Sequence, residues 1–199
     1  MQGTFQKEKC GYKWMRIGHA DTKFSTVLFT VSLSIIIFLA IWVYRELPNT
    51  KWCLVHFLAV YLVAAILYGN LGVWFHEQLH CLAFRGTVHE NQAQIIFERK
   101  YVLALSGHYR VRGGISYRIM KRTLLAPINL SIGLLIIGWL GSLILPGWWF
   151  PILLTMAVAS VMDMVHDFYM YSQIRLIGEK GKYWDKGHEI EVVWKDQEL

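Results

Sequence analysis

Two histidines and a glutamate in the stretch WFHEQLH have the types and the spacing of a zinc hydrolase site. His76 and His80 are four residues apart, so on a helix their imidazoles lie on one face, where both can bind the same ion. Glu77 lies beside them, positioned to take a proton from a water molecule that the metal activates. We therefore predict Zn²⁺ as the cofactor, His76 and His80 as metal ligands, and Glu77 as the general base.

A catalytic zinc site uses three protein ligands and keeps a further position open. The later stretch SVMDMVHDFYMY places Asp163, His166 and Asp167 on one face of a helix. A carboxylate inside an apolar segment is a functional candidate by default, because contact with lipid is costly for a charged group. We predict Asp163 as the third ligand, with Asp167 as the alternative.

The elements that must position these residues are long apolar segments. Of the 199 residues, 55% are hydrophobic and only 17% are charged. A transmembrane helix needs about 20 mostly apolar residues, and four stretches reach that length: Phe24–Tyr44, Trp52–Phe75, Leu124–Leu145 and Trp148–Tyr171. The sequence therefore predicts an all-α polytopic membrane protein with about four transmembrane helices.

A polar insert, residues 85–123, separates the second and third predicted helices. Its short apolar runs, Ile95–Phe97 and Tyr101–Leu105, are rich in β-branched and aromatic residues and favour strands, so we predict a small cytoplasmic β element there. The alternating sequence HEIEVVW near the C-terminus favours a further strand. The predicted organisation is a cytoplasmic N-terminal segment (1–23), a four-helix membrane domain (24–171) and a cytoplasmic C-terminal tail (172–199).

The net charge of +6 follows the predicted topology. Along the chain, the segments before, between and after the predicted helices hold 5, 2, 8, 0 and 5 Lys and Arg residues. This alternation is typical of the positive-inside rule with both termini in the cytoplasm. We predict a multi-pass protein of a prokaryotic cell membrane, with the lipid bilayer as its partner and no nucleic-acid partner.

With these elements in place, the chain resembles the zincin-type membrane metallopeptidases, a family of small bacterial and archaeal proteins. The resemblance rests on HEQLHCLAF, ISYRIMKRTLLAPI and AVASVMDMVHDFYMY and covers the chain from Tyr61 onward. A more distant likeness is to the site-2 proteases, which implies His76, His80 and Asp163 as ligands and Glu77 as the base. Met162 and Met164 replace glycines of the two families, which leaves Asp163 and Asp167 both open as the third ligand.

The predicted function is that of a zinc-dependent metallopeptidase embedded in the membrane. It would hydrolyse peptide bonds of membrane or membrane-proximal protein substrates. The alternative is a non-catalytic zinc-binding scaffold or regulatory protein, in which the same residues hold a structural ion. A transporter that uses the intramembrane carboxylates is less favoured, because the sequence has no internal repeat.

Overall fold

The computed structural model describes residues 4–9, 12–18, 53–101, 104–144, 149–187 and 189–195, together with isolated positions between 27 and 38. The first predicted transmembrane helix, Phe24–Tyr44, lies outside the described residues apart from those isolated positions. The other three predicted helices fall within the described part of the chain, apart from their end residues Trp52, Leu145 and Trp148.

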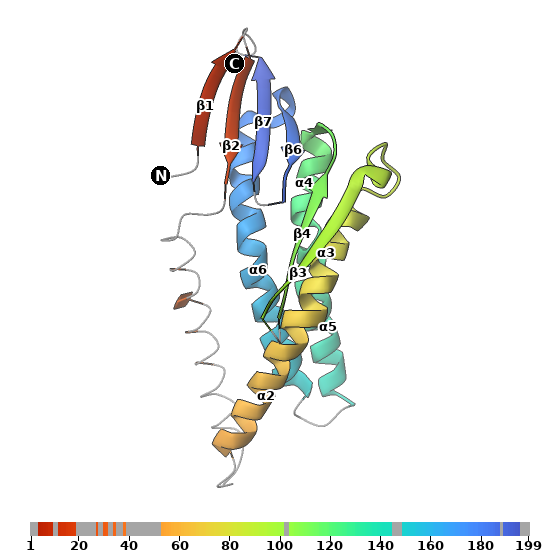
Figure 1. The fold of residues 1–199 in the computed structure, drawn as a ribbon. Coiled ribbons are helices and arrows are strands. Elements are labelled where there is room, and N and C mark those ends of the chain that lie inside the picture. Colours follow the sequence, from red (N-terminus) through yellow and green to blue (C-terminus); the bar gives the residue numbers. More distant parts are fainter. Residues whose placement is uncertain are drawn as a thin grey trace.

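The prediction of an all-α fold is wrong, because the described chain is mixed α/β. It combines long helices with a five-stranded sheet, in the order β1-β2-β7-β6-β5, and a separate two-stranded sheet of β3 and β4 (Figure 1). The five-stranded sheet was missed because four of its strands come from the two ends of the chain and β5 comes from the middle. A β-pairing between segments so far apart has no local sequence signal.

Three helical stretches of the described chain are apolar and long enough to cross a membrane: Leu58–Leu82, Tyr117–Gly141 and Trp149–Lys180. They correspond to the second, third and fourth predicted helices. The first stretch lies within α2 (Cys53–Leu67), a π-helical turn η1 (Tyr68–Gly72) and α3 (Val73–Leu82). The second lies within α4 (Tyr117–Leu125) and α5 (Ile128–Ser142). The third is α6 (Trp149–Ile177) with the short η3 (Gly178–Lys180).

Helix α4 is amphipathic, whereas the helix that follows it is apolar. Met120, Thr123 and Leu124 of α4 are buried, and basic residues occupy its exposed face. A turn at Ala126 and Pro127 ends α4, since proline has no N–H to continue the helical hydrogen bonds. The same proline then precedes α5, where its fixed φ suits a helix start.

The five-stranded sheet packs one face on the C-terminal half of α6 and on α4. Ile190, Val192 and Trp194 alternate along β7 as buried residues and join Met170 and Ile174 of α6 in one core. The strands of this sheet are β1 (Thr4–Lys9), β2 (Tyr12–Ile17), β5 (Ile115–Ser116), β6 (Lys182–Asp185) and β7 (Ile190–Lys195). The strand expected at the C-terminus is thus confirmed, as the partner of β2.

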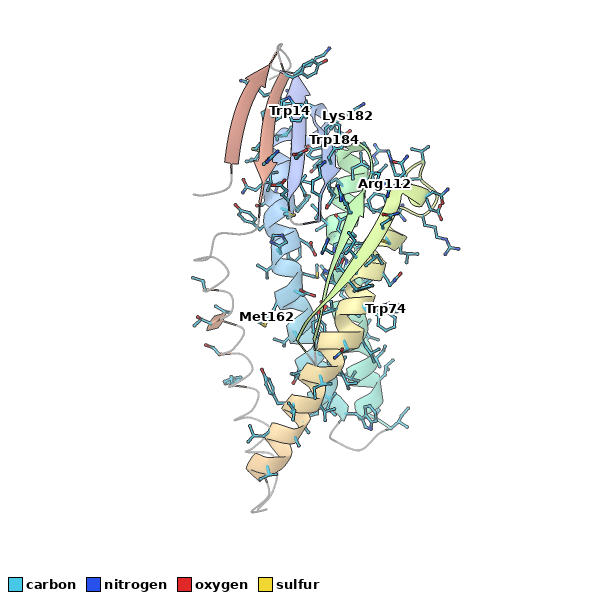
Figure 2. All side chains as sticks on the ribbon, in the orientation of Figure 1. Trp14, Trp74, Arg112, Met162, Lys182 and Trp184 are labelled. Atoms are coloured by element: carbon cyan, nitrogen blue, oxygen red, sulfur yellow. The ribbon has the colours of Figure 1, made fainter. Side chains whose placement is uncertain are left out.

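The insert between α3 and α4 forms an antiparallel hairpin that lies along α3 (Figure 1). After the short η2 (Glu90–Gln92), β3 (Ala93–Tyr101) runs down towards the junction with α2, and β4 (Ala104–Val111) returns. Strands were expected in this insert, although β3 is longer than the run Ile95–Phe97. On α3 itself, Trp74 points away from the bundle (Figure 2) and is 41% exposed.

Candidate metal centre

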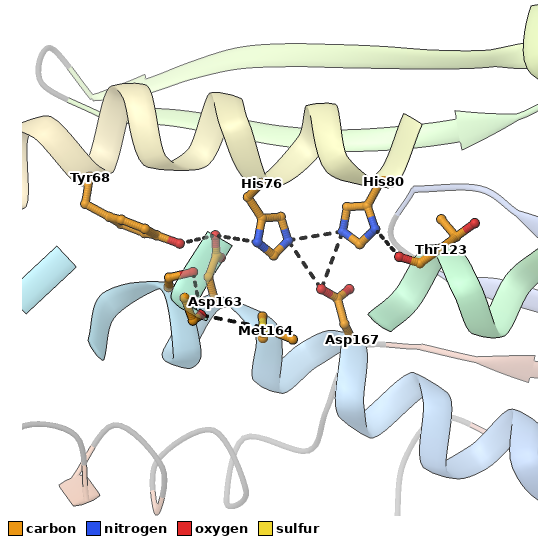
Figure 3. Close-up of polar contacts among 9 residues, drawn as sticks. Tyr68, His76, His80, Thr123, Asp163, Met164 and Asp167 are labelled. Carbon is orange, nitrogen blue, oxygen red and sulfur yellow. Dashed lines mark hydrogen bonds and ion pairs between the residues drawn. The ribbon is translucent and has the colours of Figure 1, made fainter. Parts of the chain in front are cut away.

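Helix α3 presents His76 and His80 on the face that is turned towards α6. The two side chains are one helical turn apart and both are buried. Their Nε2 atoms lie 3.1 Å apart, so the two imidazoles converge at one point (Figure 3). The predicted helical placement of the pair is therefore confirmed.

Asp167 of α6 lies opposite the two histidines and contributes the third potential ligand atom. Its Oδ2 atom lies 3.3 Å from Nε2 of His76 and 3.4 Å from Nε2 of His80 (Figure 3). Although it is close to both rings, this buried oxygen makes no hydrogen bond. Two nitrogens and one oxygen thus form a small triangle inside the protein, and together these residues can hold a metal ion.

The size and the chemistry of the triangle fit zinc. Ligand atoms bound tetrahedrally to zinc at about 2.0–2.1 Å are separated from one another by about 3.3 Å. The three separations observed here, 3.1, 3.3 and 3.4 Å, match that value. Two imidazole nitrogens and a carboxylate oxygen are also ligands that zinc accepts readily.

The ring of His80 is oriented by its surroundings. Its Nδ1 atom donates a hydrogen bond of 2.9 Å to the backbone carbonyl of Thr123 on α4, which leaves Nε2 with a free lone pair. Tyr109 of β4 stacks on the same ring, with 4.4 Å between ring centroids and 26° between planes. Neither residue was predicted as part of the site, because a backbone carbonyl and a distant strand leave no motif in the sequence.

Glu77 lies between α3 and the β3–β4 hairpin. It is buried, and its Oε2 atom makes no hydrogen bond in the structure. Its carboxylate is close enough to His76 and His80 to interact with them electrostatically. The base predicted from the sequence therefore lies beside the triangle, enclosed by strand β4.

Asp163 lies one turn before Asp167 on α6 and faces the other edge of the His76 ring. Its Oδ2 atom is 3.6 Å from Nδ1 of His76 and accepts a hydrogen bond of 3.2 Å from the hydroxyl of Tyr68 (Figure 3). The structure thus brings both predicted carboxylates to His76, one on each ring nitrogen. Only Asp167 belongs to the group that can hold one ion, and His166 is not part of that group.

A further buried carboxylate, Asp185 at the end of β6, contacts the site indirectly. It accepts a hydrogen bond from the hydroxyl of Tyr109 and one of 2.7 Å from the backbone N–H of Gly187. Burial raises the pKa of the Asp185 carboxyl to about 6, and burial also raises the pKa of the Tyr109 phenol well above its ordinary value. Tyr109 therefore stays protonated and links the five-stranded sheet to the ring of His80.

Comparison with models of known protein families, with curated proteins and with solved structures finds no match for this chain.

Proposed function

We propose that this protein is a zinc-dependent membrane metallopeptidase, related to the zincin-type family that its sequence resembles. His76, His80 and Asp167 would hold the ion, and Glu77 would act as the general base. The observation that carries the proposal is the triangle of ligand atoms, whose sides of 3.1–3.4 Å suit tetrahedral zinc, with a buried glutamate beside it.

In this proposal Asp167, rather than Asp163, is the third ligand. Asp167 directs one oxygen at both Nε2 atoms, whereas Asp163 faces the opposite nitrogen of His76. Nε2 of His76 and Asp167 would therefore hold the ion together. The direction of one imidazole ring thus supports Asp167 over Asp163, the choice that the sequence left open.

In the proposed hydrolysis, the metal site, Glu77 and strand β4 have separate roles. A bound zinc ion would polarise the scissile carbonyl and make water a stronger nucleophile. Glu77 would take the proton from the attacking water and later pass it to the leaving amine. Strand β4 keeps bulk water away from the carboxylate of Glu77, which strengthens its interaction with the nearby charges.

The placement of the site supports substrates in or near the membrane. The ligands lie on two of the helical stretches that are long enough to span a bilayer. Since β2 pairs with β7, the N-terminal and C-terminal segments lie on one side of the helices, which supports the proposal that both termini are cytoplasmic. Peptide bonds at the cytoplasmic membrane surface are therefore the proposed substrates.

A non-catalytic zinc site remains the second candidate, because the centre is closed. Glu77 is 6% exposed and His80 is 2% exposed, so a substrate would reach them only if the packing around the site opened. A purely structural ion needs no such access. Both functions require zinc, and they differ in what Glu77 does.

The test combines zinc content with turnover in detergent-purified protein. We expect about one zinc per chain in the wild type and in Asp163→Ala at saturating zinc, and loss of zinc in His80→Ala and Asp167→Ala. Wild type and Glu77→Gln are then incubated with solubilised bacterial membrane proteins, and new peptide N-termini are identified by mass spectrometry. A hydrolase produces termini that Glu77→Gln does not, by a factor of about 10²–10⁴ in rate. Zinc retained with no difference between the two would favour the structural site.

A further inference from the structure

His76 has two ring nitrogens, and the structure gives each of them a carboxylate. Nε2 faces Asp167 inside the ligand triangle, and Nδ1 faces Oδ2 of Asp163 at 3.6 Å. The Nδ1 atom is buried and makes no hydrogen bond. Because an N–H that is buried without an acceptor is costly, the carboxylate in front of it is its natural partner.

We propose that Asp163 is a positioning residue of the metal centre. It holds the proton of His76 on Nδ1 and thereby keeps the lone pair of Nε2 available for the ion. This inference rests on the proposed metal site and adds a residue that does not touch the ion. His80 has the matching arrangement, since its Nδ1 donates to the carbonyl of Thr123. Partners of this kind fix the tautomer and the orientation of metal-binding histidines.

Asp163 is itself held in place by a chain of hydroxyl groups. Its side chain is 40% exposed, so it needs a partner to keep one orientation. Tyr68, which is buried, donates to Oδ2 of Asp163 at 3.2 Å, and its hydroxyl is also hydrogen-bonded to Ser160. Ser160 in turn accepts a hydrogen bond of 2.9 Å from Ser131 of α5. The chain of hydrogen bonds leads from α5 to Asp163, whose carboxylate faces the ring of His76.

The π-helical turn η1 brings Tyr68 to the correct face. In a regular α-helix Tyr68 would lie about 80° away from His76, since eight residues make about 2.2 turns. A π-helical turn takes up about one additional residue, so the same eight residues cover about two full turns. Gly72 leaves space for the ring of Tyr68, because a methyl group on Gly72 would come within 2.3 Å of that ring. The π-helical turn thus places Tyr68 on the same helical face as His76, where it can donate to Asp163.

The test measures metal affinity in the full-length protein with zinc and a competing chelator. Asp163→Leu removes the acceptor, and we expect zinc to bind about 10–100-fold more weakly. Asp163→Asn keeps an acceptor oxygen and should recover part of that loss, while Tyr68→Phe should weaken binding in the same direction. Thr155→Val is the matched control, because it removes a hydroxyl on the same helix that bonds only locally, to the carbonyl of Pro151.

Cobalt substitution separates a positioning residue from a ligand. We expect Asp163→Leu to give the same visible absorption bands as the wild type at saturating cobalt, because the ligand set is unchanged, whereas Asp167→Asn alters them. Zinc affinity of Asp163→Leu within a factor of about two of the wild type would overturn this inference alone. Altered bands in Asp163→Leu with wild-type bands in Asp167→Asn would make Asp163 the ligand. A wild type that binds neither metal would overturn the proposed function as well.

Discussion

Gly107 of β4 lies directly against the side chain of Glu77 on α3. A methyl group built on Gly107 would come within 2.6 Å of Cγ and 3.2 Å of Cδ of Glu77, and within 3.0 Å of the ring of Phe97. Carbon atoms in packed protein are about 3.5–4.0 Å apart, so no side chain fits there. The backbone of β4 thus forms a wall that limits where the carboxylate of the proposed base can lie.

Gly107→Ala should therefore impair turnover without removing the metal. The added methyl group must push either Glu77 or the strand away, and a displacement of about 1 Å near reacting groups can cost about 100-fold in rate. Gly107 is not in the ligand triangle, so zinc content should remain about one per chain. The measurement is the rate at which a Glu77-dependent cleavage product appears, together with zinc content.

A matched control for this variant is Gly133→Ala on α5. No atom lies within 4 Å of a methyl group placed there, and alanine is a better helix former than glycine. Turnover in Gly133→Ala should equal that of the wild type. Equal turnover in Gly107→Ala would show that the carboxylate of Glu77 does not need the position that β4 enforces.

Zinc should stabilise the folded protein through the same triangle. An ion that binds only the folded state raises stability by about 2.7 kcal/mol at a free concentration 100 times its dissociation constant. We expect the thermal unfolding midpoint of the wild type to fall on treatment with a chelator and to recover with zinc. His80→Ala should show neither change, whereas His89→Ala, which alters a histidine near η2, should behave like the wild type. A chelator-insensitive wild type would argue against a resident ion.

The parts of the site that lie within one helix can be predicted from the sequence. The spacing of His76 and His80 predicts two imidazoles on one face, and the structure shows them with Nε2 atoms 3.1 Å apart. Likewise, Asp163 and Asp167 were expected on one helical face, and both meet His76. The different roles proposed for the two aspartates depend on the direction of the imidazole ring, which packing between α3 and α6 decides. No spacing within a helix specifies that direction.

The features of the fold and of the site that the sequence did not predict depend on contacts between segments that are far apart in the chain. Gly107 lies inside β4, where the close approach of Glu77 requires a glycine and no turn does. Met15 of β2 pairs with Val192 of β7 across nearly the whole chain, so neither strand alone indicates the five-stranded sheet. The all-α prediction failed for this reason, because apolar helices dominate the composition while the sheet depends on long-range pairing.

The buried carboxyl of Asp185 should make stability depend on pH. Its pKa rises from an ordinary value of 3.8 to about 6 on folding, chiefly because burial disfavours the charged form. The folded state therefore binds this proton more tightly than the unfolded state. The contribution of Asp185 is most favourable below about pH 4, declines as the pH rises to about 6, and is constant above that. The cost at neutral pH is about 3 kcal/mol.

Asp185→Asn should remove this cost and its pH dependence. The amide oxygen of asparagine can still accept from the N–H of Gly187 and from the hydroxyl of Tyr109, while no charge is buried. We expect the variant to unfold at a higher temperature than the wild type at pH 7 and at a similar temperature near pH 4. Thermal unfolding followed from pH 4 to pH 8 provides the measurement. Parallel curves for the two proteins would mean that Asp185 does not titrate in this range.

The ring of Tyr109 stacks on the ring of His80 and helps to orient it. Tyr109→Ala removes a buried ring and should cost about 3–5 kcal/mol of stability, and it should also weaken zinc binding because His80 loses the surface that orients it. Tyr109→Phe keeps the stacked ring and removes the hydroxyl, with its hydrogen bonds to Asp185 and to Sδ of Met120. Its cost should be about 1–3 kcal/mol, with zinc affinity unchanged. In an Asp185→Asn background that cost should shrink, since no buried charge is then left unpaired. Equal zinc affinities in the alanine and phenylalanine variants would show that the stacked ring does not position His80.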